Sequence, residues 1–255
     1  SFYGLWWAYA VLGNEYQIIY DLIKILSSVI SVYLIFRFFS DYMSYDRAII
    51  ASFIFVLYPL HDTTLYWYMT LQYILAPAIL LYAHHLIRNN KIRKGFLVTI
   101  VGSFLSYASP PYLFGLTVIF LYEKKLKKAI VFATPGILYV AYYFWMKFNY
   151  AGLERRINSD LSILDFLKQM LIQPLSFLES AIGPSYWLKV FYAIESIGFI
   201  SIIIIAMILI FSFIRVKSFS KVRKLPKSLY IGLISVLLLS FGMFALTGLY
   251  SHSAF

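Results

Sequence analysis

Residues 57–73 read LYPLHDTTLYWYMTLQY, a short polar break between two strongly apolar runs. Pro59 ends the first run, because a proline blocks helix continuation and biases the residue before it away from the α region. His61 and Asp62 follow, and an aromatic run that begins at Tyr66 reopens the apolar pattern. The break therefore predicts a turn between two membrane segments, which carries an imidazole and a carboxylate side by side.

The composition around this stretch is typical of a membrane protein. Of the 255 residues, 62% are hydrophobic and only 13% are charged, whereas a soluble domain is about half apolar and about a quarter charged. The apolar residues come in long blocks, and the mean hydropathy is +0.78. The expected fold class is all-α, a polytopic transmembrane helical bundle. The absence of cysteine excludes disulfides and thiolate metal sites.

Apolar runs predict about eight membrane segments in a single membrane domain, residues 1–255, which we expect to be a fragment of a longer chain. The clear runs are residues 17–36, 48–60, 67–87, 129–146, 197–214 and 228–249. Residues 95–122 are also apolar, but Ser109, Pro110 and Pro111 interrupt them at the centre. Each half is too short to be an ordinary span, so we expect a short helical hairpin that bends at the prolines.

The run at 48–60 is short for a membrane span. A helix of this length extends for roughly 20 Å, against a hydrocarbon core of about 30 Å. His61 and Asp62 are therefore expected in a pocket that dips below the membrane surface. Non-helical backbone at such a depth is tolerated where protein covers it or where it lines a watery cavity.

Residues 147–196 form the longest polar segment, and we expect them to be an outer-face loop. Within it, apolar residues recur at helical spacing at Leu161, Leu164, Leu167, Met170 and Leu171. This spacing predicts an amphipathic helix that lies on the membrane.

Lysine and arginine counts predict the orientation of the chain. The loops at 37–47, 88–94, 123–128 and 215–227 hold 16 of the 22 basic residues, so we expect them to be cytoplasmic. The formal charge of +11 then reflects membrane topology, and we expect no nucleic-acid partner. The opposite face, which carries the polar break, is expected to be the outer face of a bacterial inner membrane.

His61 and Asp62 are the first candidates for chemistry. A partly desolvated carboxylate can act as a general base or bind a divalent cation. The pair would then be an acid/base or metal-binding pair at the mouth of a lipid-accessible cavity. The alternative is a structural turn in which Asp62, Thr63 or Thr64 caps the next helix.

Further candidates for substrate binding lie on the same predicted face. Tyr66, Trp67 and Gln72 would offer a sugar ring an aromatic face and an amide, although aromatic residues gather at any membrane interface. Arg155 and Arg156 could bind a phosphate bidentately, or they could lie in a solvated loop.

Other sequence features exclude some classes of function. His84 and His85 are adjacent on a predicted helix and point about 100° apart, so they make a poor metal site. The sequence has no phosphate-cradling glycine loop, nucleotide-binding motif or serine-hydrolase elbow. An ATP-driven pump is therefore unsupported.

Three stretches together resemble the early spans of the GT-C superfamily of integral-membrane glycosyltransferases. They are GNEYQIIYDLIKIL at 13–26, VYLIFRFF at 32–39 and RAIIASFIFVLYPLHDTTLYWYMTLQYILA at 47–76. The shared features are an apolar span that ends in a proline, a histidine or acidic residue just outside it, and an aromatic-rich span. The resemblance covers about residues 14–87.

This resemblance implies sugar transfer on the outer face from a polyprenyl-phosphate-linked donor. Asp62 would be the acid of the second outer loop, whereas the family's first-loop acid has no clear counterpart and Glu15 matches it only weakly. The implied partners are membrane lipids and the lipid-linked sugar donor, with other membrane subunits as further candidates. A divalent cation held by Asp62 is the one cofactor that the sequence suggests.

Two other functions fit parts of the sequence. A transporter or lipid flippase could use the broken hairpin at 95–122 to line a path, because discontinuous helices are common in transporters. A non-catalytic scaffold subunit of a membrane complex would need the polar break only as a turn.

Overall fold

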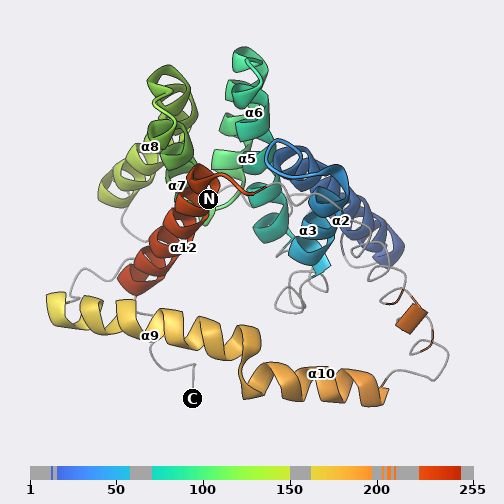
Figure 1. Ribbon diagram of the computed structural model, residues 1–255. Coiled ribbons are helices and arrows are strands. Elements are labelled where there is room, and N and C mark those ends of the chain that lie inside the picture. Colours follow the sequence, from blue (N-terminus) through green and yellow to red (C-terminus); the bar gives the residue numbers. More distant parts are fainter. Residues whose placement is uncertain are drawn as a thin grey trace.

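The computed structural model describes residues 16–57, 71–149, 162–196 and 224–247, together with five isolated positions. Every regular element in these ranges is an α-helix, which agrees with the expected all-α class. The helices are α2 (Gln17–Phe39), α3 (Tyr45–Leu57), α5 (Gln72–Arg88), α6 (Ile92–Leu105), α7 (Ser109–Tyr122), α8 (Leu126–Asn149), α9 (Ile163–Ile182), α10 (Pro184–Ser196) and α12 (Lys227–Thr247). Figure 1 shows α9 and α10 as a layer along one side of the other helices.

Three helices in the described ranges are long and apolar enough to cross a membrane, namely α2, α8 and α12. Many of their large apolar side chains are exposed, as contact with lipid requires. The prediction of about eight membrane segments is not supported. That prediction takes each apolar run as one membrane segment. However, α3, α5, α6 and α7 have only 13 to 17 residues, about 20 to 26 Å of helix, which is less than the hydrocarbon thickness of about 30 Å. The predicted span at 197–214 lies almost entirely outside the described residues.

Helices α6 and α7 form the two halves of the interrupted segment predicted at 95–122. The break lies at residues 106–108, however, and not at the two prolines. Pro110 and Pro111 stand in the first turn of α7, where a missing backbone N–H costs nothing. The hydroxyl of Ser109 donates to the carbonyl of Gly102 at 2.7 Å, which links the two helices across the bend.

Small residues allow α7 and α12 to pack almost backbone to backbone. A Cβ atom on Gly115 would lie 2.6 Å from the backbone nitrogen of Val236, and Gly232 of α12 in turn faces Ile119 of α7. Helices in lipid usually associate through such close packing, because burying apolar side chains contributes little free energy to association there. The buried core continues from this contact into α5 and α2 through Leu113, Leu116, Ile74, Leu80, Ile35 and Phe38.

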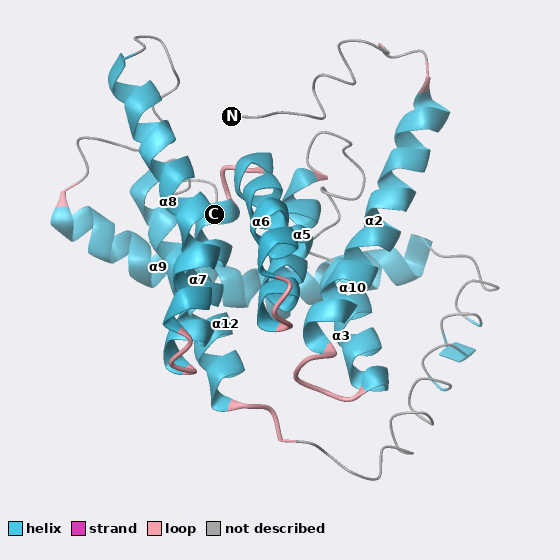
Figure 2. Ribbon diagram, turned by 90° about the horizontal axis from the view of Figure 1, so that it is seen from above, coloured by secondary structure: helices cyan, strands magenta, loops and turns pink. Residues whose placement is uncertain are grey.

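Helices α9 and α10 form a layer against the C-terminal part of α12 (Figure 1), and they pass across the other helices between their two ends (Figure 2). We call the end of the bundle toward which the C-terminal part of α12 extends the far end. The rings of Phe177 in α9 and Phe241 in α12 meet with centroids 5.8 Å apart. Helix α9 starts at an N-cap, because the hydroxyl of Ser162 accepts the backbone N–H of Asp165 at 3.1 Å. The helix expected around residues 161–171 is therefore present and continues to Ile182.

The contact between α7 and α12 predicts a specific cost for one methyl group. In the variant Gly115→Ala the new Cβ meets backbone of Val236, which cannot turn aside. We expect a loss of about 1–3 kcal/mol in unfolding free energy, typical of overpacking. The measurement is reversible unfolding of the purified chain in mixed detergent micelles.

Gly242→Ala on α12 is the matched control, because its Cβ would meet only the Sδ of Met170 at an ordinary 3.9 Å. This variant should be as stable as the parent or slightly more stable, since alanine favours helix over glycine. Equal stability of the two variants would contradict the close packing of α7 on α12.

Candidate functional site

Most of the residues predicted for the site lie outside the described part of the chain. These residues are His61, Asp62, Tyr66, Trp67, Arg155 and Arg156. Gln72 is described, as the first residue of α5, and its side chain is buried (3% exposed). Its role in substrate binding stays a prediction.

The start of α5 meets the bend between α6 and α7. The hydroxyl of Tyr73 donates to the hydroxyl of Tyr107 at 2.8 Å, and the two rings meet edge to face with centroids 5.7 Å apart. Gln72 and this tyrosine pair therefore mark one level in the bundle, on the side of the far end. The segment at 58–70, which contains His61 and Asp62, joins the last residue of α3 to this start of α5.

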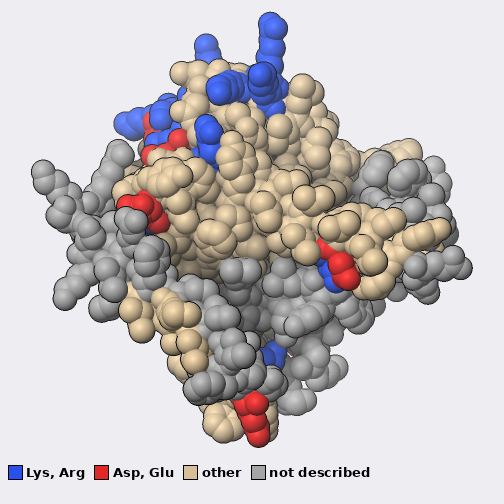
Figure 3. Space-filling model, turned by 90° about the vertical axis from the view of Figure 1, so that its right-hand side faces the viewer, with Lys and Arg blue, Asp and Glu red and all other residues tan. Residues whose placement is uncertain are grey.

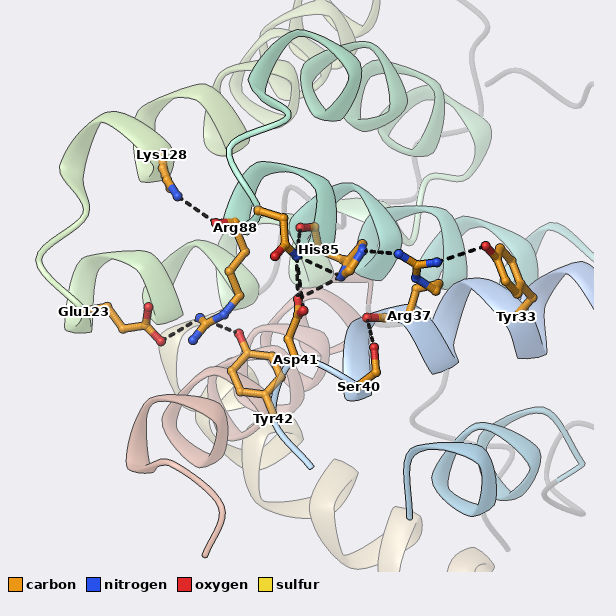
Figure 4. A network of polar contacts seen from close by, with 10 residues as sticks. Tyr33, Arg37, Ser40, Asp41, Tyr42, His85, Arg88, Glu123 and Lys128 are labelled. Carbon is orange, nitrogen blue, oxygen red and sulfur yellow. Dashed lines mark hydrogen bonds and ion pairs between the residues drawn. The ribbon is translucent and has the colours of Figure 1, made fainter. Parts of the chain in front are cut away.

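The other end of the bundle holds a polar network that the sequence did not predict (Figure 4). His85 of α5 contacts Asp41 after α2, with Nδ1 2.9 Å from the carboxylate oxygen. Arg37 lies 3.3 Å from the other ring nitrogen, Nε2. Since an arginine only donates, Nε2 accepts from Arg37, and Nδ1–H donates to the carboxylate of Asp41. The imidazole thus links α2 to α5.

Arg88 and Glu123 form the second half of the polar network. The guanidinium of Arg88 donates to a carboxylate oxygen of Glu123 at 2.7 Å and to the hydroxyl of Tyr42 at 3.0 Å. The Cζ atom of Arg88 also lies 4.5 Å from the centroid of the Tyr42 ring. Ser228, at the start of α12, donates to the same oxygen of Glu123 at 3.1 Å, and Lys128 of α8 donates to the carbonyl of Arg88 at 2.8 Å. The network thus joins the ends of α2, α5, α7, α8 and α12.

Electrostatics follow from this geometry. Burial alone would raise the pKa of the Glu123 carboxyl, but hydrogen bonds from Lys125 and Arg88 together hold that pKa at about 2. Burial raises the pKa of the Tyr42 phenol, which therefore stays protonated at neutral pH. Glu123 is therefore ionised near pH 7 and surrounded by cations, an arrangement that suits holding helix ends together and does not suit proton transfer at that pH.

The two adjacent histidines have different surroundings. His84 is fully buried, with its ring stacked on Phe120 at 4.1 Å between centroids and edge-on to Phe38 and Phe132. Neither ring nitrogen of His84 has a hydrogen-bond partner, whereas His85 pairs with Asp41. Among the described residues no group of three or more His, Cys, Asp or Glu side chains lies close enough to hold a metal ion.

Exposed cations surround the polar network, and we call this part of the molecule the basic end. Its exposed members are Lys91, Arg93, Lys94, Lys124, Lys127, Lys224 and Lys227. Figure 3 shows this gathering of basic side chains at one extremity of the molecule. Asp41 and Glu123 are paired within the network, and Asp46 at the start of α3 is exposed. The four loops predicted to share one side therefore include three that meet at one end through described contacts. Their assignment to the cytoplasm remains a prediction from charge counts.

Only part of this network had a signal in the sequence. The alternation of basic loops implied that the loops at 37–47, 88–94 and 123–128 lie on one side. Arg88 and Glu123 are 35 residues apart, and no local pattern relates them. The one available signal is Glu123 itself, an acidic residue in the otherwise basic loop 123–128. An acid in such a loop is a candidate partner for a partly buried cation such as Arg88.

Comparisons with protein-family models, with curated proteins and with solved structures find no match for this chain. The resemblance to the GT-C superfamily over about residues 14–87 therefore stands on the residues quoted for it.

The depressed pKa of Glu123 predicts an acid-sensitive stability. A carboxyl with a lower pKa in the folded than in the unfolded chain stabilises the fold above its unfolded value, and this contribution is lost as the pH falls toward the folded value. For Glu123 that window runs from the ordinary value of 4.5 down to about 2. The thermal midpoint of the parent should therefore exceed that of Glu123→Gln at pH 6, and the gap should close between pH 5 and pH 2.

The measurement is the thermal midpoint in detergent at a series of pH values, followed by tryptophan fluorescence. Asp165→Asn is the control, because Asp165 is an exposed acid on α9 outside the polar network. A gap between parent and Glu123→Gln that is the same at pH 6 and pH 2 would show that the ion pair is not responsible.

Proposed function

We propose that this chain is a GT-C-like glycosyltransferase, which moves a sugar from a polyprenyl-phosphate-linked donor to an acceptor on the outer face of the membrane. The observation that carries the proposal is the position of His61 and Asp62 in sequence, between the end of α3 and the start of α5. Helix α5 ends in the polar network at Arg88, and α3 begins at Tyr45, three residues after the network residue Tyr42. The termini that flank the segment, Leu57 and Gln72, are therefore the ones farther from the network. The family resemblance supplies the reaction type.

The proposed reaction assigns one role to each candidate residue. An acceptor hydroxyl attacks the anomeric carbon of the donor sugar and gives its proton to the carboxylate of Asp62. The bond from that carbon to the phosphate oxygen breaks, and the polyprenyl phosphate leaves with the electron pair. Arg155 and Arg156 would neutralise the departing phosphate. Tyr66 and Trp67 would stack on the sugar ring.

The exposed apolar helices support a donor that stays in lipid. Helices α2, α8 and α12 can cross the membrane by length and composition, and they present apolar side chains outward. A polyprenyl tail can therefore remain in the acyl chains while its sugar approaches the far end. A water-borne acceptor would reach the same end from the opposite side of the headgroups.

The transporter alternative rests on the interrupted pair α6–α7. Discontinuous helices that coordinate a substrate normally do so with free backbone groups or charged side chains. Residues 95–122 contain no charged residue, and the hydroxyls of Thr99, Ser103 and Thr117 donate to carbonyls of their own helices. The transferase is therefore the function that we favour.

The direct test is the variant Asp62→Asn. Native membranes that contain the parent or the variant are supplied with polyprenyl-phosphate-linked hexoses, and transfer of labelled sugar is measured. We expect a loss of at least about 100-fold for the variant, because general base catalysis commonly contributes about 10²- to 10⁴-fold.

Asp46→Asn is the matched control, because Asp46 is an exposed carboxylate at the start of α3, away from the far end. It should leave transfer unchanged. Equal transfer by parent and Asp62→Asn membranes, at equal protein amounts, would remove the catalytic assignment. Absence of any transfer by the parent, with the protein present and folded, would favour the scaffold subunit.

A further inference from the structure

The length of each helix, measured from the basic end, gives the distance that it extends across the membrane. Helix α6 extends from there for 14 residues and α5 for 17, about 21 and 26 Å of helix. Helix α12 also starts there, and α9 crosses it at Gly242, where a Cβ would lie 3.9 Å from the Sδ of Met170. That crossing comes 15 residues after Lys227, or about 22 Å along the axis.

The outer helices of the bundle are longer than this. Helices α2 and α8 have 23 and 24 residues, about 35 Å each. The hydrocarbon core of a bilayer is about 30 Å thick, so the centre of the bundle ends roughly 4–9 Å short of its far boundary. Any tilt of the central helices only lowers their ends further. The crossing helix α9 therefore lies at the depth of lipid and not above it.

Helix α9 has three distinct faces that suit this depth. The face toward the bundle carries Met170, which lies against Gly242 of α12, and Phe177, whose ring meets that of Phe241. A second face carries the charges Asp165, Lys168 and Glu179. A third face, about a quarter turn from the charges, is an apolar stripe that no described element covers, as the exposed fractions of 82% at Ile163 and 72% at Leu171 show. This apolar stripe consists of Ile163, Leu167, Leu171, Leu175, Leu178 and Ile182.

Helix α10 continues the same pattern with aromatic residues. Trp187 and Tyr192 are exposed by more than three fifths, and the indole N–H of Trp187 donates to the carbonyl of Ile182 at 3.1 Å. Exposed tryptophan and tyrosine favour the boundary between acyl chains and headgroups. The aromatic residues Tyr142 and Trp145 are likewise exposed near the C-terminal end of α8.

We propose that α9 and α10 are sunk into the leaflet at the far end, with the apolar stripe against acyl chains and the charged face toward water. The phospholipid headgroups of that leaflet then lie closer to the basic end than in an undisturbed bilayer. The chain thins the membrane over α5, α6 and α7, and it brings lipid phosphates down toward the level of Tyr73 and Tyr107. The occupant of the stripe is phospholipid.

The thinning deepens the proposed function, because a polyprenyl phosphate in the same leaflet would be lowered toward the level at which α5 begins, the helix that follows His61 and Asp62 in sequence. It rests on the membrane placement in that proposal and not on catalysis. The test below needs no turnover, so a failure of Asp62 as a catalytic residue and a failure of the thinning give different results.

The first measurement uses the absence of cysteine in the sequence. Single-cysteine variants Leu171→Cys and Lys168→Cys are labelled with a small fluorophore and reconstituted in phosphatidylcholine vesicles. Quenchers are spin labels at the headgroup or at carbon 5 of the acyl chain. We expect the label at position 171 to be quenched at least about twofold more by the acyl-chain probe, and the label at 168 more by the headgroup probe.

Two outcomes would overturn the proposal. Stronger quenching at position 171 by the headgroup probe would place α9 on the surface. No quenching at 171 by either probe would mean that protein, such as a second copy or another subunit, covers the stripe.

The second measurement tests the thinning itself. The thermal midpoint of the whole chain is compared in phosphatidylcholines with monounsaturated chains of 14, 18 and 22 carbons. Because mismatch costs fractions of a kcal/mol per Å, we expect the midpoint to be highest in the 14-carbon lipid and lowest in the 22-carbon lipid. A maximum at 22 carbons, or no dependence, would contradict the thinning.

Discussion

The contact between Arg88 and Glu123 is the constraint on which the rest of the structure depends. Arg88 stands at the end of α5 and Glu123 follows the end of α7, and each is largely shielded from water. A shielded charge without its partner is strongly unfavourable, so the two helix ends stay together. Ser228 and Lys128 bind to the same pair of residues and bring the starts of α12 and α8 to this level. These polar contacts hold the helix ends at one level.

That alignment makes the opposite end uneven. Helices that share the level of the polar network but differ in length reach different depths, and the short α6 and α5 extend less far from it than α2 and α8 do. The bend at 106–108 and the start of α5 therefore lie closer to the basic end than the opposite termini of α2 and α8 do. Helices α9 and α10 cross at this depth. The proposed transferase and the proposed thinning depend on the same feature. The bundle is shorter at the start of α5 and at the bend at 106–108, where lipid can approach from one side and water from the other.

The sequence predicted the features that depend on local pattern. Long apolar runs gave α2, α8 and α12, and the 3.6-residue period around Leu164 and Leu167 gave α9. The number of spans was wrong because an apolar run does not say where its helix ends, as the prolines in α7 illustrate: they begin a helix and do not form the bend. The ion pair of Arg88 and the burial of Gln72 depend on neighbours far along the chain, which no local pattern contains. For His61, Asp62 and the paired arginines the predictions concern residues outside the described ranges.

The central claim is that Arg88 and Glu123 stabilise the fold through each other. A double-mutant cycle with Arg88→Met, Glu123→Gln and the combined variant measures this coupling by reversible unfolding in mixed micelles. The account predicts a coupling free energy of at least about 1 kcal/mol, as for a shielded hydrogen bond between charged groups. Effects that add to within about 0.3 kcal/mol, as expected for independent sites, would contradict the account.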